Sequence, residues 1–197
     1  MAKEDISWWV IGLEYFHGTT GFLCDSPLPS YEFATDACLI GGGGHFGSEW
    51  FYVNWAIDVP EVSSSHINVL ELETVLIAAD LWGSQWKNRC VLVRSDNMAT
   101  VAAVNKGTSR SEDLMGIIQR IFWLSVKHGF RLKAAFIPGK CNILSDLISR
   151  LHSPAAAFSL ESFLAFNSAP IECVGHMTER SFLFLQESWE TMTWLDC

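Results

Sequence analysis

The chain has 197 residues, 49% of them hydrophobic and 18% charged, and a formal net charge of −9 at pH 7. This composition is typical of a globular protein with a sizeable core. A net negative charge argues against a general nucleic-acid coat protein, because such proteins bind mainly by neutralising phosphates. It does not exclude a site that meets phosphate through metal ions.

Six cysteines are spread along the chain without a Cys-x-x-Cys pair, which favours reduced thiols and an intracellular protein, cytoplasmic or nuclear. The first residues, MAKEDISWWVIGL, carry Glu4 and Asp5 where a signal peptide would be basic. No uncharged apolar run reaches the roughly 18 residues that a membrane helix needs. We therefore expect no membrane partner.

The chain is expected to contain three segments. Residues 1–30 combine a helix over 4–17 with the breaker sequence CDSPLPS, which resembles a linker in its proline content. Residues 31–151 form the main domain. Residues 152–197 form a C-terminal extension whose pattern predicts neither a structure nor a chemistry.

The main domain begins with short strands and then alternates strands with helices. Its expected elements are strands over 31–40, 45–55 and 56–62, a helix over 68–86, a strand over 90–95, helices over 98–105 and 111–128, a strand over 131–137 and a helix over 143–151. Gly41 to Gly44 are expected to turn the first strand into the second. This order predicts an α/β fold with a five-stranded mixed sheet flanked by helices.

Asp36 lies in the middle of the first expected strand, in the sequence FATDACLIGGGGHFG. A buried and unpaired carboxylate costs several kcal/mol of folding free energy. Asp36 must therefore either reach the surface or find a positively charged partner.

Other acidic residues lie at positions that fit either a structural role or a role in a functional site. At about 100° per residue, Glu71 lies on the packed face of its helix, whereas Glu73 is expected to face water. Asp96 follows the strand CVLVRS, where open α/β sheets bind ligands, although it could also cap the next helix. Asp146 lies in the last helix, where it could pair with Arg150.

The four carboxylates occur in an order that resembles a known family. The segments FATDACLIGGGGHFG, HINVLELETVLIAADLW, VLVRSDNMATVAAVNKG and FIPGKCNILSDLISR resemble the ribonuclease H domain of retroelement reverse transcriptases, of the DIRS type and Ty3-like. The resemblance covers residues 31–151. The preceding sequence ISWWVIGLEYFHG resembles the segment that joins such a domain to its polymerase.

The resemblance implies a ribonuclease H-like fold and an endoribonuclease that hydrolyses the RNA strand of RNA/DNA hybrids. The first strand is then expected to be central and to lie beside the fourth, because Asp36 and Asp96 must meet in one site. It also implies covalent neighbours, a reverse transcriptase and a recombinase, in a retroelement polyprotein. The implied metal ligands are Asp36, Glu71, Asp96 and Asp146, which would hold two Mg²⁺ or Mn²⁺ ions. The implied substrate contacts are Gly41, Gly42, Gly43, Asn68, Asn97 and Lys140.

Two departures from the family pattern concern the substrate. Cellular members carry a histidine in the loop before the last Asp, where this chain has Gly139-Lys140-Cys141-Asn142. A basic, Trp-bearing handle between the helices at 98–105 and 111–128 is not evident. The first departure bears on the rate of turnover and not on the metal chemistry, and the second predicts low affinity for the hybrid in isolation.

Two alternative functions stay open. A non-catalytic nucleic-acid-binding or scaffold module could retain the fold, although it would have no physical need for four carboxylates. Another nuclease of the same superfold, such as an integrase or a Holliday-junction resolvase, could share the chemistry. The position of Glu71, before Asp96 in the chain, favours ribonuclease H over integrases, whose Glu comes last.

Overall fold

The computed structural model describes residues 28–47 and 49–151, together with Ile6 and Val10. Apart from those two residues, the helix expected over 4–17 lies outside the described residues, as does the extension 152–197. Within the described part of the chain, none of the helices has the length and apolar composition that a membrane crossing would require.

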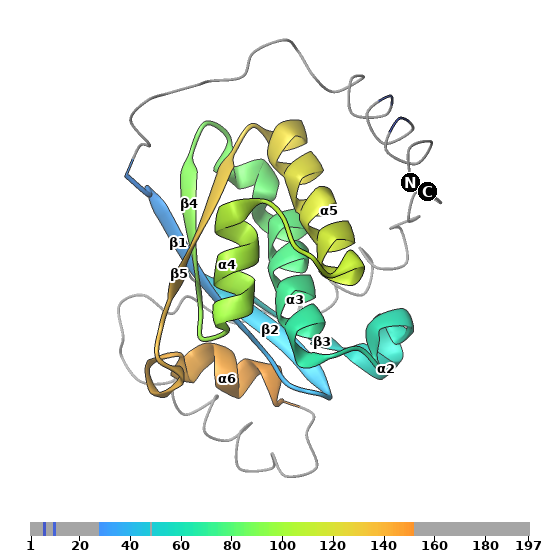
Figure 1. The fold of residues 1–197 in the computed structure, drawn as a ribbon. Coiled ribbons are helices and arrows are strands. Elements are labelled where there is room, and N and C mark those ends of the chain that lie inside the picture. Colours follow the sequence, from blue (N-terminus) through green and yellow to red (C-terminus); the bar gives the residue numbers. More distant parts are fainter. Residues whose placement is uncertain (1–5, 7–9, 11–27, 48, 152–197) are drawn as a thin grey trace.

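Five strands form one mixed sheet in the order β3-β2-β1-β4-β5 (Figure 1). The strands are β1 (Tyr31–Ala37), β2 (Gly41–Phe46), β3 (Glu49–Asn54), β4 (Cys90–Ser95) and β5 (Arg131–Phe136). The pairs β1–β2 and β2–β3 are antiparallel, whereas β1–β4 and β4–β5 are parallel. The expected mixed sheet of five strands, with its first strand central and beside the fourth, is confirmed.

Helices lie on both faces of this sheet. The longer ones are α3 (Ile67–Trp82), α4 (Met98–Lys106), α5 (Glu112–His128) and α6 (Ile143–Ser149), and the short elements are α2 (Trp55–Asp58) and 3-10 turns at Pro60–Val62, Gly83–Trp86 and Gly139–Cys141. Helices α3, α4 and α5 pack together on one face, and α6 packs on β1 and β2 (Figure 1).

The glycines of β2 allow helices to approach the strand closely from opposite sides. A Cβ atom at Gly42 would lie 2.6 Å from Thr74 Oγ1 of α3. A Cβ atom at Gly43 would collide with Ile148 of α6 and lie 2.8 Å from the carbonyl oxygen of Phe51. Because neighbouring residues of a strand point to opposite faces, α3 and α6 cover opposite faces of β2.

The turn expected at Gly41 to Gly44 is wrong, because these glycines belong to β2. Residues 38–40 make the turn instead, and the Cys38 N–H donates to the Gly41 carbonyl at 2.8 Å. The prediction rests on the freedom of glycine to turn and on the close approach of a substrate to residues without side chains, and it leaves out the packing of helices against the strand. All four glycines are buried, so packing accounts for the run. Contact of Gly41, Gly42 and Gly43 with a substrate stays a prediction.

The strand expected over 56–62 is also wrong, because α2 and the turn at Pro60–Val62 occupy these residues. Asn54 caps α2, since its side chain accepts a hydrogen bond from the Ala56 N–H at 3.1 Å. The Asp58 carboxylate in turn accepts from the Asn54 N–H at 2.7 Å. These two local hydrogen bonds end β3 and start a helix.

The sheet nevertheless has five strands. The glycine run belongs to β2, which was not expected, and β2 takes the place of the strand expected over 56–62. The strand expected over 45–55 is observed as β3. The helix expected over 68–86 is observed as α3, which ends at Trp82. The 3-10 turn Gly83–Trp86 follows directly.

Aromatic side chains pack α3 and the turn that follows it against β1, the central strand of the sheet. Phe33 of β1 stacks on Trp86, with ring centroids 5.0 Å apart, and meets Trp82 edge-on at 6.1 Å. All three side chains are buried. Since β1 also carries Asp36 and α3 also carries Glu71, this packing fixes the strand and the helix that bring the two carboxylates together.

We predict that Gly43→Ala lowers the free energy of unfolding by about 1–3 kcal/mol, because the added methyl group pushes α6 away from β2. Urea unfolding followed by circular dichroism measures the change. Gly116→Ala in α5 is the matched control, since a Cβ atom there meets no described atom within 4 Å and alanine favours a helix. Equal stability of the two variants would contradict the packing explanation.

Candidate active site

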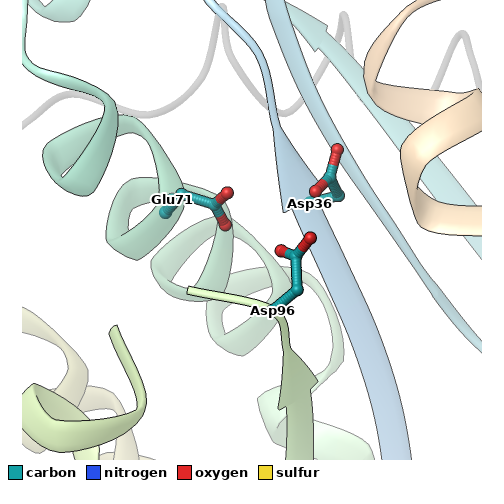
Figure 2. Close-up of side chains that lie close together, drawn as sticks. All are labelled: Asp36, Glu71 and Asp96. Carbon is teal, nitrogen blue, oxygen red and sulfur yellow. The ribbon is translucent and has the colours of Figure 1, made fainter. Parts of the chain in front are cut away.

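Three carboxylates converge at the edge of the sheet where β1 and β4 end (Figure 2). Asp36 lies in β1, Asp96 directly follows β4, and Glu71 projects from the second turn of α3. Each offers an oxygen atom, and these atoms lie within 4.8 Å of one another. Parallel pairing of Ala34 with Arg94 makes the two strands reach this edge together. The structure thus brings together three of the four expected carboxylates, which we call the acidic cluster.

Burial dominates the electrostatics of Asp36, which is 4% exposed. It raises the pKa of Asp36 from the ordinary value of 3.8 to about 7. A hydrogen bond donated by Ser149 opposes this rise in pKa, and the charges of Asp96 and Asp146 add to it. In the absence of a cation, Asp36 therefore holds a proton up to near neutral pH.

Glu71 is equally buried and lies in a more unfavourable environment for its charge. Burial first, and then the charges of Asp36 and Asp96, raise the pKa of Glu71 from 4.5 to about 9, although a backbone hydrogen bond from Ala37 opposes the rise. Among the described residues, no group forms a hydrogen bond with the buried Oε2 of Glu71. A buried carboxylate oxygen without a partner costs free energy of folding, and the described residues supply no hydrogen bond that would offset this cost.

The acidic cluster suits a divalent cation. Carboxylate oxygens are the hard ligands that Mg²⁺ and Mn²⁺ prefer. A cation between the three residues would give the Glu71 Oε2 a partner and would lower the pKa values of Asp36 and Glu71. Asp36, Glu71 and Asp96 can therefore hold a metal ion, while the number of ions stays a prediction.

Asp146 lies beside the acidic cluster and is not part of it. Its Oδ1 accepts a hydrogen bond from Arg150 Nε at 2.7 Å, which is the ion pair that the sequence suggested as a structural explanation. The Asp146 side chain is 44% exposed. Its charge nevertheless raises the pKa of Asp36, which indicates that the two carboxylates are near each other.

Asn68 and Asn97, both expected substrate contacts, lie next to each other. Asn97 Nδ2 donates a hydrogen bond to Asn68 Oδ1 at 3.0 Å. Asn97 also caps α4, because its side chain accepts hydrogen bonds from the N–H groups of Ala99 and Thr100. The cap is therefore Asn97, and this leaves the carboxylate of Asp96 free of that structural role.

The loop before α6 borders the acidic cluster. A Cβ atom at Gly139 would lie 2.8 Å from Asp96 Oδ2. The buried Asn142 anchors the loop, since its Nδ2 donates to the Thr35 carbonyl at 3.0 Å. Lys140, an expected substrate contact, is exposed in this loop. The anchored loop therefore carries a positively charged residue, Lys140, next to the candidate site.

The expected exposure of Glu73 is wrong. Glu73 is 1% exposed and pairs with Arg120 of α5 at 3.4 Å. Helix α5 packs against the side of α3 that was expected to face water. The signal in the sequence was the scarcity of polar residues in INVLELETVLIAADLW, which favours a helix buried on most of its surface.

Ser149 is a further polar residue beside the acidic cluster that the sequence pattern does not single out. Its Oγ donates a hydrogen bond to Asp36 Oδ2 at 2.6 Å, and the residue is fully buried. The available signal was its spacing from Asp146, since residues three apart lie on the same side of a helix. Ser149 therefore adds a polar side chain to the surroundings of the acidic cluster.

Comparison with protein-family models and with curated proteins finds no match. Comparison with solved structures finds similarity to ribonuclease H1 from the halophilic archaeon Halobacterium salinarum, with a TM-score of 0.47, 12% sequence identity, and coverage of 67% of this chain and 98% of that chain. The N-terminal ribonuclease H domain of a Mycobacterium tuberculosis protein, solved as a fusion with maltose-binding protein, has a TM-score of 0.42, 13% identity, and coverage of 68% and 99%.

We predict that, in chelator, the free energy of unfolding falls as the pH rises from about 5 to about 9. Because the pKa values of Asp36 and Glu71 are raised in the folded state, the folded chain holds protons that the unfolded chain has released. Each such proton lowers the free energy of unfolding by about 1.4 kcal/mol per pH unit. Urea unfolding at several pH values measures the slope.

The control for this slope is the double variant Asp36→Asn with Glu71→Gln, which removes both titrating groups at little change in volume. Its pH dependence should be clearly flatter than that of the natural chain. Equal slopes for the two proteins would contradict the assignment of raised pKa values to these residues.

Proposed function

We propose that the chain is a metal-dependent endoribonuclease that hydrolyses the RNA strand of RNA/DNA hybrids. The observation that carries the proposal is the acidic cluster, which gathers three carboxylates from distant parts of the chain at the carboxyl ends of parallel strands. Ligands of open α/β sheets bind at such ends. The ribonuclease H-like sheet and the order of the carboxylates along the chain support the same reaction.

In this proposal, Asp36, Glu71 and Asp96 would hold divalent cations, and Asp146 would complete the ligand set. When bound, two Mg²⁺ or Mn²⁺ ions supply an activated water and stabilise the charge of the leaving oxygen. The burial of Asp36 and Glu71 keeps their oxygens fixed and away from competing water. The exposed position of Asp146 leaves it free to exchange Arg150 for another cation.

The neighbouring polar residues would bind and orient the hybrid. The amides of Asn68 and Asn97 would contact the minor groove, where A-form-like duplexes display the 2′-hydroxyls that distinguish RNA from DNA. Their mutual hydrogen bond fixes both amides. Lys140 would contact a phosphate, because its loop borders Asp96 and its side chain is exposed.

We further propose a retroelement origin, on the sequence motifs alone. Residues 31–151 would be the degrading domain of a polyprotein, or of a gene derived from one, with 1–30 as its connection to a polymerase. A reverse transcriptase and a recombinase would be its covalent neighbours, and the location would be intracellular.

The reaction is tested by incubating the purified full chain with labelled RNA/DNA, RNA/RNA and DNA/DNA duplexes, each with Mg²⁺, with Mn²⁺ and with chelator. We expect cleavage of the RNA strand of the hybrid only, and only with metal. Binding of the hybrid without cleavage would favour a non-catalytic module. Cleavage of the DNA duplex would instead favour another nuclease of the same superfold.

We predict that Glu71→Gln lowers hybrid cleavage by more than about 100-fold, since even residues that only support metal ligands contribute 10- to 100-fold. Its thermal stability in chelator should equal that of the natural chain near pH 7, where the raised pKa of Glu71 already keeps this group uncharged, and should exceed it above about pH 9. Glu112→Gln, in the exposed first turn of α5, is the control and should cleave normally. A Glu71→Gln protein that cleaves as well as Glu112→Gln would contradict the assigned role.

A further inference from the structure

Ser149 is the last residue of α6, and it links that helix to the acidic cluster. Its Oγ donates a hydrogen bond to Asp36 Oδ2 at 2.6 Å. The serine is 0% exposed, and Asp36 is 4% exposed. We infer that Ser149 is a positioning residue that orients the Asp36 carboxylate for metal binding, an inference that rests on the proposed function.

The Ser149 hydroxyl has two acceptors within reach and only one hydrogen to donate. Besides Asp36 Oδ2, the backbone carbonyl of Asp146 lies at 3.0 Å. The bond to Asp36 is the shorter, and a hydrogen bond to an ionised carboxylate is about twice as strong as one between neutral groups. The proton therefore lies on the side of Asp36 whenever the carboxylate is charged, which is the form that binds a cation.

The position of Ser149 is itself fixed by packing on β1 and β2. Ile148, the preceding residue, is fully buried and fills the space that the missing side chain of Gly43 leaves in β2. The Ser149 carbonyl accepts a hydrogen bond from Cys38 Sγ at 3.2 Å, just after the end of β1. Packing against β2 and a hydrogen bond from the end of β1 therefore both hold Ser149 in position.

The hydrogen bond has a defined consequence for the acidic cluster. A carboxylate can rotate about its bond to Cβ, and binding of one oxygen to Ser149 restricts that rotation. The orientation that remains is the one in which an oxygen of Asp36 lies within 4.8 Å of oxygens of Glu71 and Asp96. Partners of this kind that fix metal ligands typically contribute 10- to 100-fold to metal affinity.

Ser145 provides a matched control within the same helix. It lies one turn before Ser149 and is also 0% exposed. Among the described residues, its Oγ has no hydrogen-bond partner. Ser145→Ala and Ser149→Ala therefore remove the same atom from equally buried sites, and only the second removes a bond to the acidic cluster.

The test measures Mn²⁺ binding to the full chain in the absence of nucleic acid, by electron paramagnetic resonance of the free ion. We expect Ser149→Ala to weaken Mn²⁺ binding by about 10-fold or more, and Ser145→Ala to leave it unchanged. In hybrid cleavage, Ser149→Ala should lower kcat with little change in KM. Ser149→Thr, which keeps the hydroxyl, should restore most of the Mn²⁺ affinity.

Two further measurements keep the outcomes distinct. Thermal melts establish that each variant folds, and Ser149→Cys, which is similar in size and a weak donor, replaces any variant that does not. In the Asp36→Asn background, Ser149→Ala should have no additional effect on Mn²⁺ affinity.

Equal Mn²⁺ affinity of Ser149→Ala and Ser145→Ala, with normal binding and cleavage by the natural chain, would overturn the inference alone. A natural chain that neither binds Mn²⁺ nor cleaves the hybrid would overturn the proposed function and the inference with it.

Discussion

Two carboxyl groups, Asp36 and Glu71, are buried at one edge of the sheet, and their burial is unfavourable unless their charge is neutralised. Asp36 and Glu71 are each 4% exposed, and each has an oxygen atom within 4.8 Å of the other and of an oxygen of the partly buried Asp96. Water cannot screen these charges, so protons or a metal ion must neutralise them. In the metal-free chain, the raised pKa values of both residues mean that protons neutralise them.

Packing elsewhere in the fold holds this unfavourable arrangement in place. Parallel pairing of β1 with β4 makes Asp36 and Asp96 neighbours, and the aromatic contacts of Phe33 fasten the helix that carries Glu71 to the same strand. On the opposite face, the absence of side chains in β2 lets α6 approach closely enough for Ser149 to reach Asp36. Hydrophobic packing thus determines the geometry of a polar site.

Features set by local pattern could be predicted from the sequence, whereas features set by long-range packing could not. Hydrophobic periodicity predicts β1, β3, β4 and β5, whereas the resemblance to ribonuclease H domains predicts that the first strand is central and that Asp36 and Asp96 meet. Glu73 was misplaced because its partner, Arg120, lies 47 residues further along the chain on a helix whose position no local pattern reveals. The glycine run was misread for the same reason: its neighbours, Thr74 and Ile148, come from two different helices.

Thermal unfolding of the natural chain in chelator and in millimolar Mn²⁺ tests the central claim, a metal site at the acidic cluster, most directly. A ligand that binds only the folded chain stabilises it by about 2.7 kcal/mol at 100 times its Kd, which corresponds to a rise in Tm of about 5–10 °C. The account predicts such a rise for the natural chain and little or none for the double variant Asp36→Asn with Asp96→Asn. A Tm of the natural chain that does not change with Mn²⁺, or an equal rise in the double variant, would contradict it.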